Sequence, residues 1–424
     1  MEIDRVVNRD CLEGMRELEE NSVDAIVTDP PYGISMMGKD WDKGVPGIPY
    51  WQEALRVAKP GGHLLAFGSP RMHHRLMVAI EDAGWELRDC LMWVFGGSMP
   101  KGLDISKAID KAAGVEREVV GTVRRWGNNA GKGRGGQYGN GYEASVVGAE
   151  KFDPVTAPAT DAAKQWEGWN TGLKPAYEPV ILARKPLDGT VAETVLKWGC
   201  GGINIEGCRI GTDLISAHGG GQPYDRIYGG GRGIPAIERG SNPHTGRWPA
   251  NLLLDEAAAD LLDQQSGTLK SGANPARRGP AKFKTCYGEF KGQESCTVHR
   301  GANSGGASRF FYCSKASKKE RSGSLHPTVK PLDLMRYLCR LVTQPGGLIL
   351  DPFIGSGTTA VAAVHEGFHY LGFEINPAYC ADAERRIAEA RREIAAPRPA
   401  KRGNPASKDA PPATTLAAFG TEET

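Results

Sequence analysis

The chain has 424 residues, and its 52 lysines and arginines nearly balance its 50 aspartates and glutamates, which leaves a formal net charge of +2. This length and balance exclude a peptide, a histone-like polycation and an acidic disordered tail protein. No apolar run approaches the ~18 residues of a membrane span, and the N-terminus lacks the apolar stretch of a secretory signal. We therefore expect a soluble cytoplasmic protein that has no membrane partner and has room for two or three domains.

The nine cysteines are spread over the whole chain. No two of them have the C-x2–4-C spacing that zinc fingers and zinc ribbons use, so we expect no metal site. In a reducing compartment these cysteines are expected to be free thiols and not a disulfide framework.

The first hundred residues alternate between short apolar strands and helices. Strands are predicted at residues 3–7, 23–27, 63–67 and 85–95, and helices at residues 12–18, 51–58 and 71–83. The turn Pro60-Gly61-Gly62 is expected to separate the second helix from the strand that follows. This alternation predicts a parallel α/β sheet.

The middle of the chain is different in character. Its glycines gather in three clusters that mark loops, at residues 131–141, 219–233 and 301–306. Asp104 is expected to cap a short helix with one apolar face. That face holds Ile105, Ala108, Ile109 and Ala112. A strand predicted at residues 179–183 returns to the sheet after this insertion.

The last part of the chain alternates again and then loses its apolar content. Strands are predicted at residues 348–350 and 370–373, and helices at residues 335–342, 360–365 and 378–394. Beyond residue 396 the chain is rich in Pro, Ala, Lys, Thr and Gly, which predicts a disordered tail.

The segment LILDPFIGSGTT, residues 348–359, joins a strand, a glycine turn and the start of a helix. Backbone N–H groups and the helix dipole meet a cofactor at such a place. A P-loop is unlikely because Thr358 stands where that motif has lysine, whereas Gly355, Gly357 and Ala360 satisfy the weaker dinucleotide pattern. Glu374, at the end of the next strand, suits the ribose diol of an adenosine cofactor. A plain structural turn, with Glu374 as an exposed charge, is the alternative.

The tetrapeptide Asp29-Pro30-Pro31-Tyr32 follows a buried strand directly and is more specific. Two prolines make the loop rigid and remove two N–H donors, so its carbonyls are free to accept hydrogen bonds. The Asp29 carboxylate and the Pro30 carbonyl are suited to bind an exocyclic amino group, while Tyr32 offers a ring on which a base stacks. Such acceptors localise the nitrogen lone pair and make it a better nucleophile. A Pro-Pro turn with Tyr32 in the core is the alternative.

Three segments together carry a family resemblance: residues 29–32, the segment HPTVKP at residues 326–331, and DPFIGSGTT at residues 351–359. They resemble the amino-methylating DNA methyltransferases that use S-adenosylmethionine, in the motif order of the β group. The resemblance covers about the first hundred residues and residues 325–394. It implies a Rossmann-like, seven-stranded methyltransferase sheet in circularly permuted order, in which the two ends of the chain complete one sheet around a large inserted target-recognition region.

The resemblance also implies a division of the chain. The methyltransferase core has a catalytic half at residues 1–97, a returning strand at 174–187 and a cofactor-binding half at 325–395. A glycine-rich insertion occupies residues 98–173, the target-recognition region 188–324 and the disordered tail 396–424.

Roles for individual residues follow from the same resemblance. Asp29, Pro30, Pro31 and Tyr32 form the catalytic loop. Residues that line the methionine and ribose end of the cofactor are expected to be Asp351, Phe353, Gly355, Ser356, Gly357 and Thr358. Glu374 holds the ribose hydroxyls and Asp10 the adenine amino group, while Thr328 and Lys330 contact the methionine carboxylate. For Asp10 and Lys330, an exposed cap and a surface lysine are the alternatives.

An aspartate in the first position of the catalytic loop goes mainly with N6-adenine methylation in this family, so Asp29 favours adenine over N4-cytosine. The base must then be flipped out of double-stranded DNA. A basic stretch at residues 267–321 carries aromatic residues and is suited to phosphates and base edges. The DNA contacts expected there are Arg277, Arg278, Lys282, Lys284, Lys318 and Lys319.

Two further possibilities stay open at this point. A solvated surface without DNA is the alternative for the basic stretch, and an NAD-dependent oxidoreductase would use the same glycine turn. The resemblance leaves open a homodimer and a restriction endonuclease that acts on the same site.

Overall fold

The computed structural model describes residues 2–34, 42–97, 102–124, 152–216, 243–271, 284–285, 288–289, 303–315 and 329–396. Its centre is a nine-stranded sheet with the order β1-β17-β16-β2-β3-β7-β4-β10-β15. In chain order these strands are β1 (Arg5–Asn8), β2 (Val23–Thr28), β3 (Ala58–Phe67), β4 (Glu86–Val94), β7 (Tyr177–Arg184), β10 (Leu252–Asp255), β15 (Tyr312–Ser314), β16 (Leu348–Asp351) and β17 (His369–Glu374).

The predicted α/β sheet in permuted order is confirmed. β1, from the N-terminus, pairs in parallel with β17, from the C-terminal half, so that Val6 lies opposite Gly372. β16, β2 and β3 continue the sheet in parallel, and β7 runs antiparallel between β3 and β4. Two strands, β10 and β15, extend the expected seven beyond β4, and both come from residues 188–324.

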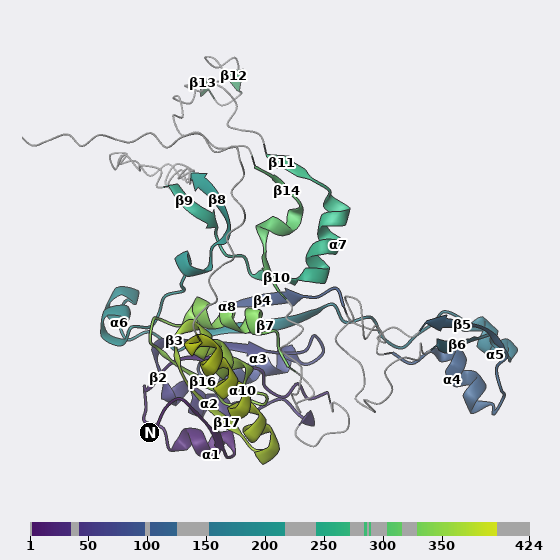
Figure 1. Ribbon diagram of the computed structural model, residues 1–424, viewed down its shortest axis with the longest axis horizontal. Helices are drawn as coiled ribbons and strands as arrows, with labels where there is room; N and C mark the ends of the chain where they lie inside the picture. The colour runs from purple at the N-terminus through teal and green to yellow at the C-terminus, as the bar shows by residue number, and fades with distance from the viewer. Residues whose placement is uncertain are drawn as a thin grey trace, which may run out of the picture.

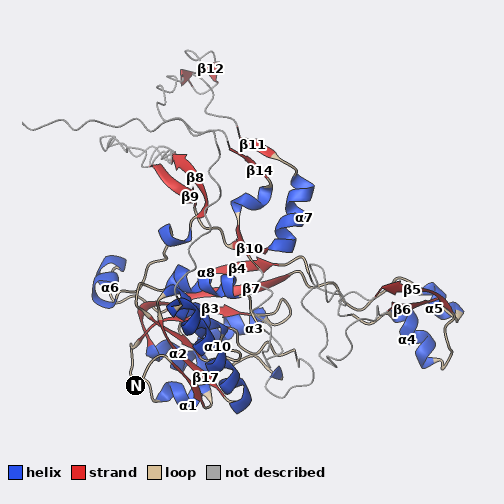
Figure 2. Ribbon diagram, in the orientation of Figure 1, coloured by secondary structure: helices blue, strands red, loops and turns tan. Residues whose placement is uncertain are grey.

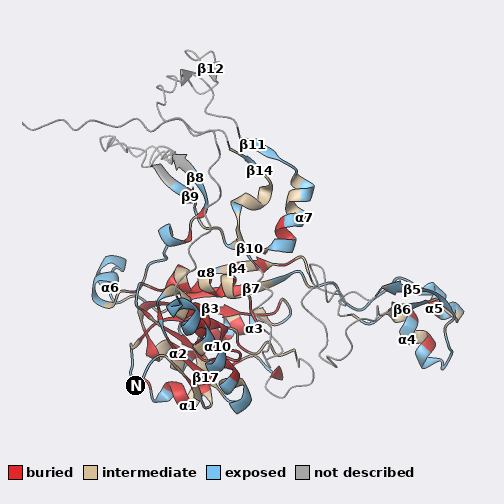
Figure 3. Ribbon diagram, viewed as in Figure 1, coloured by how far each residue is buried: buried red, intermediate tan, exposed pale blue. Residues whose placement is uncertain are grey.

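Helices cover both faces of the sheet (Figure 1). The first face is packed by α1 (Cys11–Arg16), α2 (Ile48–Val57) and α3 (His73–Asp82), and the second by α8 (Leu332–Val342), α9 (Thr358–Glu366) and α10 (Pro377–Ala395). Neighbouring residues of β2 alternate between the two cores, with Ile26 in one and Val27 in the other. Figure 3 shows the buried residues concentrated in this sheet and on the inward faces of its helices.

β3 begins earlier than the sequence predicts. We expected Pro60-Gly61-Gly62 to separate a helix from a strand at residue 63, but the strand already starts at Ala58. The pairing with β2 shifts register between Val23 and Ala25, and Gly61 has a φ of +76°. Proline and glycine are tolerated at such an irregularity, where the regular ladder is interrupted.

The insertion after β4 forms an arm that extends away from the sheet (Figure 1). Its elements are α4 (Ile105–Ala112), β5 (Val119–Arg124), β6 (Phe152–Thr156) and α5 (Asp161–Gln165). As predicted, Asp104 caps α4 by accepting a hydrogen bond from Lys107 N at 3.0 Å. However, the fully buried residues of α4 are Ser106 and Asp110, and not the expected apolar face.

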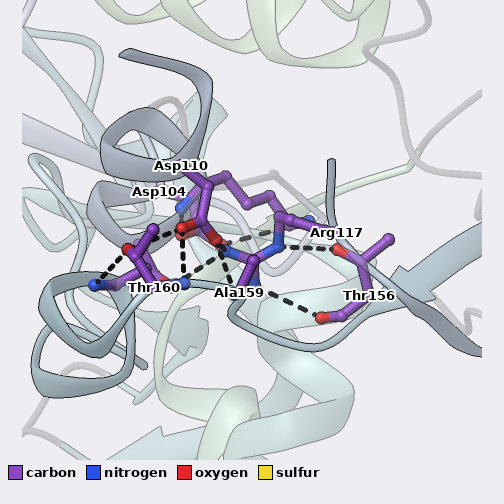
Figure 4. Close-up of polar contacts among 9 residues, drawn as sticks. Asp104, Asp110, Arg117, Thr156, Ala159 and Thr160 are labelled. Carbon is purple, nitrogen blue, oxygen red and sulfur yellow. Dashed lines mark hydrogen bonds and ion pairs between the residues drawn. The ribbon is translucent and has the colours of Figure 1, made fainter. Parts of the chain in front are cut away.

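The interior of the arm is a polar network around Asp110, where a larger domain would have an apolar core (Figure 4). The Asp110 carboxylate accepts hydrogen bonds from Ala159 N (3.0 Å), Thr160 N (3.0 Å), Thr160 Oγ1 (2.8 Å) and Arg117 Nη1 (2.8 Å). Burial by itself would raise the pKa of Asp110, but these hydrogen bonds and the Arg117 charge lower it to about 2. Asp110 therefore ties together three segments of the arm as a fully satisfied anion.

Of the remaining elements, α6 (Val191–Trp198) lies beside β3, whereas the others lie above the sheet in the view of Figure 2. These others are η3 (Glu206–Cys208), β8 (Ile210–Ser216), β9 (Pro243–Arg247), α7 (Glu256–Ser266), β11 (Leu269–Ser271), β12 (Lys284–Thr285), β13 (Gly288–Glu289), β14 (Asn303–Gly305) and η5 (Ala307–Phe310). None of the helices in the described part of the chain has the length and apolar content needed to cross a membrane.

Candidate active site

A cavity of about 500 Å³ opens beside the carboxyl ends of β1, β2, β16 and β17. Ligands of open α/β sheets bind at this edge, because loops after neighbouring parallel strands converge there. Both motif loops from the sequence line the cavity. Its walls include Asp10, Asp29, Pro30, Pro31, Tyr32, Lys330, Asp351, Phe353, Gly355, Ser356, Thr358 and Glu374.

The glycine turn that follows β16 has a shape that requires glycine. Gly357 has a φ of +78°, and a Cβ built there would lie 2.8 Å from the Cβ of Ala383 on α10. Gly357 N donates to Ile354 O at 2.8 Å, and Ile354 N donates to Phe373 O at 3.1 Å. The turn is thus held tightly against β17 and α10, and Gly357 supports the cavity from behind while Gly355 lines it.

Arg386 of α10 holds the same turn by hydrogen bonds to Ser356 and Thr358, which flank Gly357. Its Nη1 donates to the Ser356 carbonyl oxygen and, at 3.1 Å, to Thr358 Oγ1. The Ser356 and Thr358 hydroxyls lie 3.1 Å apart. A buried guanidinium makes the backbone of this turn rigid before any ligand binds, which lowers the ordering cost of binding.

Asp351, at the end of β16, is a buried carboxylate with neutral partners. It accepts hydrogen bonds from Thr28 Oγ1 and Thr359 Oγ1, both at 2.6 Å, and from Phe353 N at 3.1 Å. Burial raises the pKa of Asp351 to about 6, although these hydrogen bonds oppose the rise. Asp351 therefore links the end of β16 to β2 and α9 at the floor of the cavity.

Two further carboxylates stand at the ends of the outer strands. Glu374, at the end of β17, accepts a hydrogen bond from Asn376 N at 2.7 Å, and burial raises its pKa above the ordinary range of glutamate. Asp10 caps α1 by accepting hydrogen bonds from Leu12 N at 2.9 Å and Glu13 N at 3.2 Å. Both carboxylates line the cavity and leave lone pairs that a polar ligand can use.

An apolar wall adjoins these polar groups. The Phe353 ring packs between Tyr50, with ring centroids 6.0 Å apart, and the buried Trp51, at 6.2 Å. Phe353 and Tyr50 both line the cavity. An aromatic wall next to a few placed polar groups is typical of sites that bind a small molecule or cofactor.

The end of the Asp29–Tyr32 loop is fixed by hydrogen bonds to Asp42. This buried carboxylate accepts hydrogen bonds from Tyr32 N at 2.7 Å and Gly33 N at 2.9 Å. The Tyr32 hydroxyl donates to Asp29 Oδ1 at 2.8 Å. Together with the two prolines, these contacts give the loop one defined conformation.

Lys330 lines this part of the cavity, and Glu178 contacts Lys330 from outside the lining. Lys330 Nζ lies 2.8 Å from Asp29 Oδ2, 3.1 Å from Glu178 Oε2 and 2.9 Å from the Tyr32 hydroxyl. Sequence reasoning assigned Lys330 to the cofactor, and the structure places its ammonium against the Asp29–Tyr32 loop. Glu178 was not among the predicted residues, although its position before Pro179 at the start of a predicted strand was a usable signal.

The structure thus brings together twelve of the expected catalytic and cofactor residues, with Gly357 directly behind them. Thr328 lies outside the described residues, as do Arg277, Arg278, Lys282, Lys318 and Lys319. Of the expected DNA contacts, only Lys284 falls on a described element, β12. Asp42, Tyr50, Glu178 and Arg386 are the site residues that sequence reasoning missed. Within the described residues, no cluster of His, Cys, Asp and Glu side chains is arranged to hold a metal ion.

Three known proteins show similarity to this chain. Type II methyltransferase M.HindIII of Haemophilus influenzae is 21% identical over 421 residues, which cover 88% of this chain and 92% of that protein. The putative methylase YubD of Escherichia coli is 40% identical over 69 residues, which are 16% of this chain and 30% of that protein. Among solved structures, the M1.HpyAVI–SAM complex is 15% identical with a TM-score of 0.37, over 90% of this chain and 98% of that one.

The sequence profile of the DNA methylase family matches residues 23–110 and 226–385, which together make up more than half of the chain. The first matched segment contains the Asp29–Tyr32 loop, and the second contains Lys330, the glycine turn and Glu374. The chain therefore belongs to the DNA methylase family, the amino-methylating DNA methyltransferases.

Proposed function

We propose that the protein transfers a methyl group from S-adenosylmethionine to the N6 amino group of adenine in double-stranded DNA. The observation that carries this proposal is the single cavity in which the glycine turn after β16 faces the Asp29–Tyr32 loop after β2. A cofactor held by the first loop and a base held by the second meet in that cavity. Family membership favours this reading over an NAD-dependent oxidoreductase that uses the same glycine turn.

The cofactor half of the cavity fits an adenosine ligand. Glu374, partly buried at the end of β17, accepts hydrogen bonds from the two ribose hydroxyls, and Asp10 accepts one from the adenine amino group. Phe353 and the turn at Gly355 line the ribose and methionine end. When bound, S-adenosylmethionine supplies a methyl group that its sulfonium charge has already activated.

The base half of the cavity fits an exocyclic amino group. The Asp29 carboxylate and the Pro30 carbonyl accept its two N–H bonds, and the Tyr32 ring stacks on the base. These acceptors draw the nitrogen toward a tetrahedral arrangement and concentrate its lone pair on the side that faces the methyl group. Because Pro30, Pro31 and the Asp42 contacts fix the loop beforehand, little reorganisation is needed at the moment of transfer.

The choice of adenine over cytosine rests on Asp29, since this position of the family motif is mainly aspartate in enzymes that methylate adenine N6. The base reaches the cavity only after it flips out of the duplex, which costs a few kcal/mol that stacking and the loop hydrogen bonds offset. The basic side chains in residues 267–321 are proposed to neutralise DNA phosphates during this step.

The test is expression of the full chain in a bacterial strain without DNA methylation, followed by single-molecule sequencing of the genomic DNA. We expect N6-methyladenine in one recurring short sequence. N4-methylcytosine there would move the assignment to the alternative base, and an unmodified genome with soluble, cofactor-binding protein would refute the proposal. Asp29→Ala is the matched variant, and its methyl transfer should fall by about a hundredfold or more with cofactor affinity kept within about twofold.

The homodimer and the restriction endonuclease acting on the same site stay predictions of the resemblance. Sedimentation of the purified chain tests the first. The recognition sequence found by sequencing shows which endonuclease activity to seek in the source organism.

A further inference from the structure

Four polar side chains, those of Asp29, Tyr32, Glu178 and Lys330, contact one another beside the base half of the cavity. Both oxygens of the Asp29 carboxylate are engaged, because Oδ1 accepts from the Tyr32 hydroxyl at 2.8 Å and Oδ2 pairs with Lys330 Nζ at 2.8 Å. Glu178 Oε2 lies 3.1 Å from the same ammonium and 3.3 Å from the same hydroxyl. Glu178 therefore touches both groups that occupy Asp29.

The topology of the sheet explains why Glu178 is there. β7 runs antiparallel to β3 and β4, so its first residues lie at the edge where β2 and β3 end. Glu178 pairs across the ladder with Trp93, and the next residue, Pro179, precedes a run that is completely buried. The side chain is thus held by a central strand and not by a loop, which suits a residue that must keep a fixed position.

The four side chains carry more negative than positive charge. Two carboxylates share one ammonium, and the side chains of Lys330, Glu178 and Asp29 are only 10%, 14% and 23% exposed. Lys330 Nζ also lies over the ring of Phe67, at 4.8 Å from its centroid, which stabilises the cation at this place. A buried carboxylate without a partner is costly, so each of the two acids depends on Lys330.

An arriving amino group needs lone pairs on Asp29 that the network already uses. If Lys330 had only Asp29 as its anion, the base would have to break a largely buried ion pair before its N–H groups were accepted. Glu178 removes that obstacle, because the ammonium is already within 3.1 Å of a second carboxylate. Tyr32 has the same choice, since its hydroxyl reaches either acid.

We propose that Glu178 is a positioning residue that takes over the Lys330 ammonium and the Tyr32 hydroxyl when Asp29 turns its carboxylate to the amino group of the target base. This inference rests on the proposed function, because it assigns Asp29 to the base. With Glu178 present, Lys330 keeps a carboxylate partner when the base enters. The base therefore does not have to break an ion pair without replacement. Glu178 itself does not touch the base.

The test uses the variant Glu178→Gln in the full chain, which keeps the shape and the oxygen but removes the charge. Duplex DNA that contains the recognition sequence, with 2-aminopurine directly beside the target adenine so that the target keeps its 6-amino group, reports flipping by fluorescence. Single-turnover methyl transfer is measured in parallel, and calorimetry gives the dissociation constant of S-adenosylmethionine. We expect flipping and transfer to fall by about tenfold to a hundredfold, while cofactor affinity stays within about twofold.

Two variants supply the controls. Glu178→Asp keeps the negative charge and should recover part of the lost rate. Glu86→Gln removes a glutamate that, like Glu178, is outside the cavity lining. Glu86 pairs with Arg184 at 2.6 Å, at the far end of β7 from Glu178, so this variant should leave flipping and transfer unchanged.

A double-variant cycle separates positioning from a merely structural role. Without the Lys330 ammonium there is no cation to relocate, so Glu178→Gln should weaken flipping much less in a Lys330→Met background than in the parent. Equal losses in the two backgrounds would overturn the proposal, as would wild-type flipping and transfer in Glu178→Gln. A parent chain that methylates DNA while Glu178→Gln is unaffected leaves the proposed function standing, whereas a parent that methylates no DNA removes both.

Discussion

The two glycines that flank α9 offer a test of why the cofactor turn has its sequence. Gly357 precedes the helix and Gly367 follows it, and their φ values are nearly identical at +78° and +77°. Their surroundings differ, because a Cβ at Gly357 would lie 2.8 Å from the Cβ and 3.0 Å from the Cα of Ala383, whereas a Cβ at Gly367 would meet nothing within 4 Å. Alanine at both positions therefore suffers the same backbone strain, but only one collides with α10.

The magnitudes follow from these two contributions. A left-handed conformation costs an alanine about 1–2 kcal/mol, and the stiffer unfolded chain returns about 0.4–1 kcal/mol of it, so Gly367→Ala should destabilise the core by about 1 kcal/mol. Gly357→Ala should lose a further 1–3 kcal/mol, roughly the cost of overpacking a tight contact. Because the collision can be relieved only by moving the turn, the dissociation constant of S-adenosylmethionine should rise by about tenfold or more for Gly357→Ala.

The assays are thermal unfolding of the full chain and calorimetric titration with S-adenosylmethionine. We expect Gly367→Ala to lower the melting temperature slightly and to bind the cofactor like the parent. Gly357→Ala should melt well below Gly367→Ala and bind weakly. Equal melting temperatures for the two variants, with equal cofactor affinities, would refute the reasoning, since they would mean that Ala383 yields without effect.

Three further outcomes test other parts of the structure. Because burial raises the pKa of Asp351 to about 6, the parent loses stability as pH rises from the ordinary pKa of aspartate to about 6. Asp351→Asn should therefore gain stability relative to the parent by about 1.4 kcal/mol as pH rises from about 5 to 7.5; parallel melting curves would contradict this. Arg386→Met should weaken cofactor binding by about tenfold, unlike the exposed Arg392→Met on the same helix, and equal affinities would contradict the bracing role. Asp110→Ala should open the arm to proteases while the exposed Asp161→Ala does not, and equal resistance would contradict the network of Figure 4.

Much of the fold could be predicted because the sheet is built from short apolar runs with turn signals between them. The two motif loops also fall directly after strands, and in an α/β sheet that position alone brings them to one edge. Sequence-based prediction fails for segments whose secondary structure is decided by tertiary contacts and not by their own residue pattern. β10 and β15 have four and three residues, too few for a pattern, and become strands only by pairing with β4 and with each other.

The parts of the site that sequence reasoning missed share a physical cause. Asp42 and Arg386 act through hydrogen bonds to backbone groups, of a residue 10 positions away for Asp42 and 30 positions away for Arg386, and such bonds leave no pattern of residue types. Glu178 reaches its partners only because β7 runs antiparallel, which a strand prediction does not specify. The apolar residues of α4 do recur with helical spacing. However, the arm is too small to bury an apolar face, and the hydrogen-bonded network around Asp110 is buried there instead.

The join between the two ends of the chain is part of the candidate site and not only of the fold. Asn8 and Glu374 lie opposite each other in the β1–β17 ladder although they are 366 residues apart in the sequence. The Asn8 side chain donates to the Glu374 carbonyl oxygen at 2.8 Å, and Arg9 N donates to the same oxygen at 3.0 Å. Asp10 follows at once, so the distance between the two carboxylates proposed to hold the adenosine is set by this short parallel pairing. The glycine turn lies wholly within the C-terminal half, but the proposed adenosine site also needs Asp10, which is brought beside Glu374 only when the first strand pairs with the last.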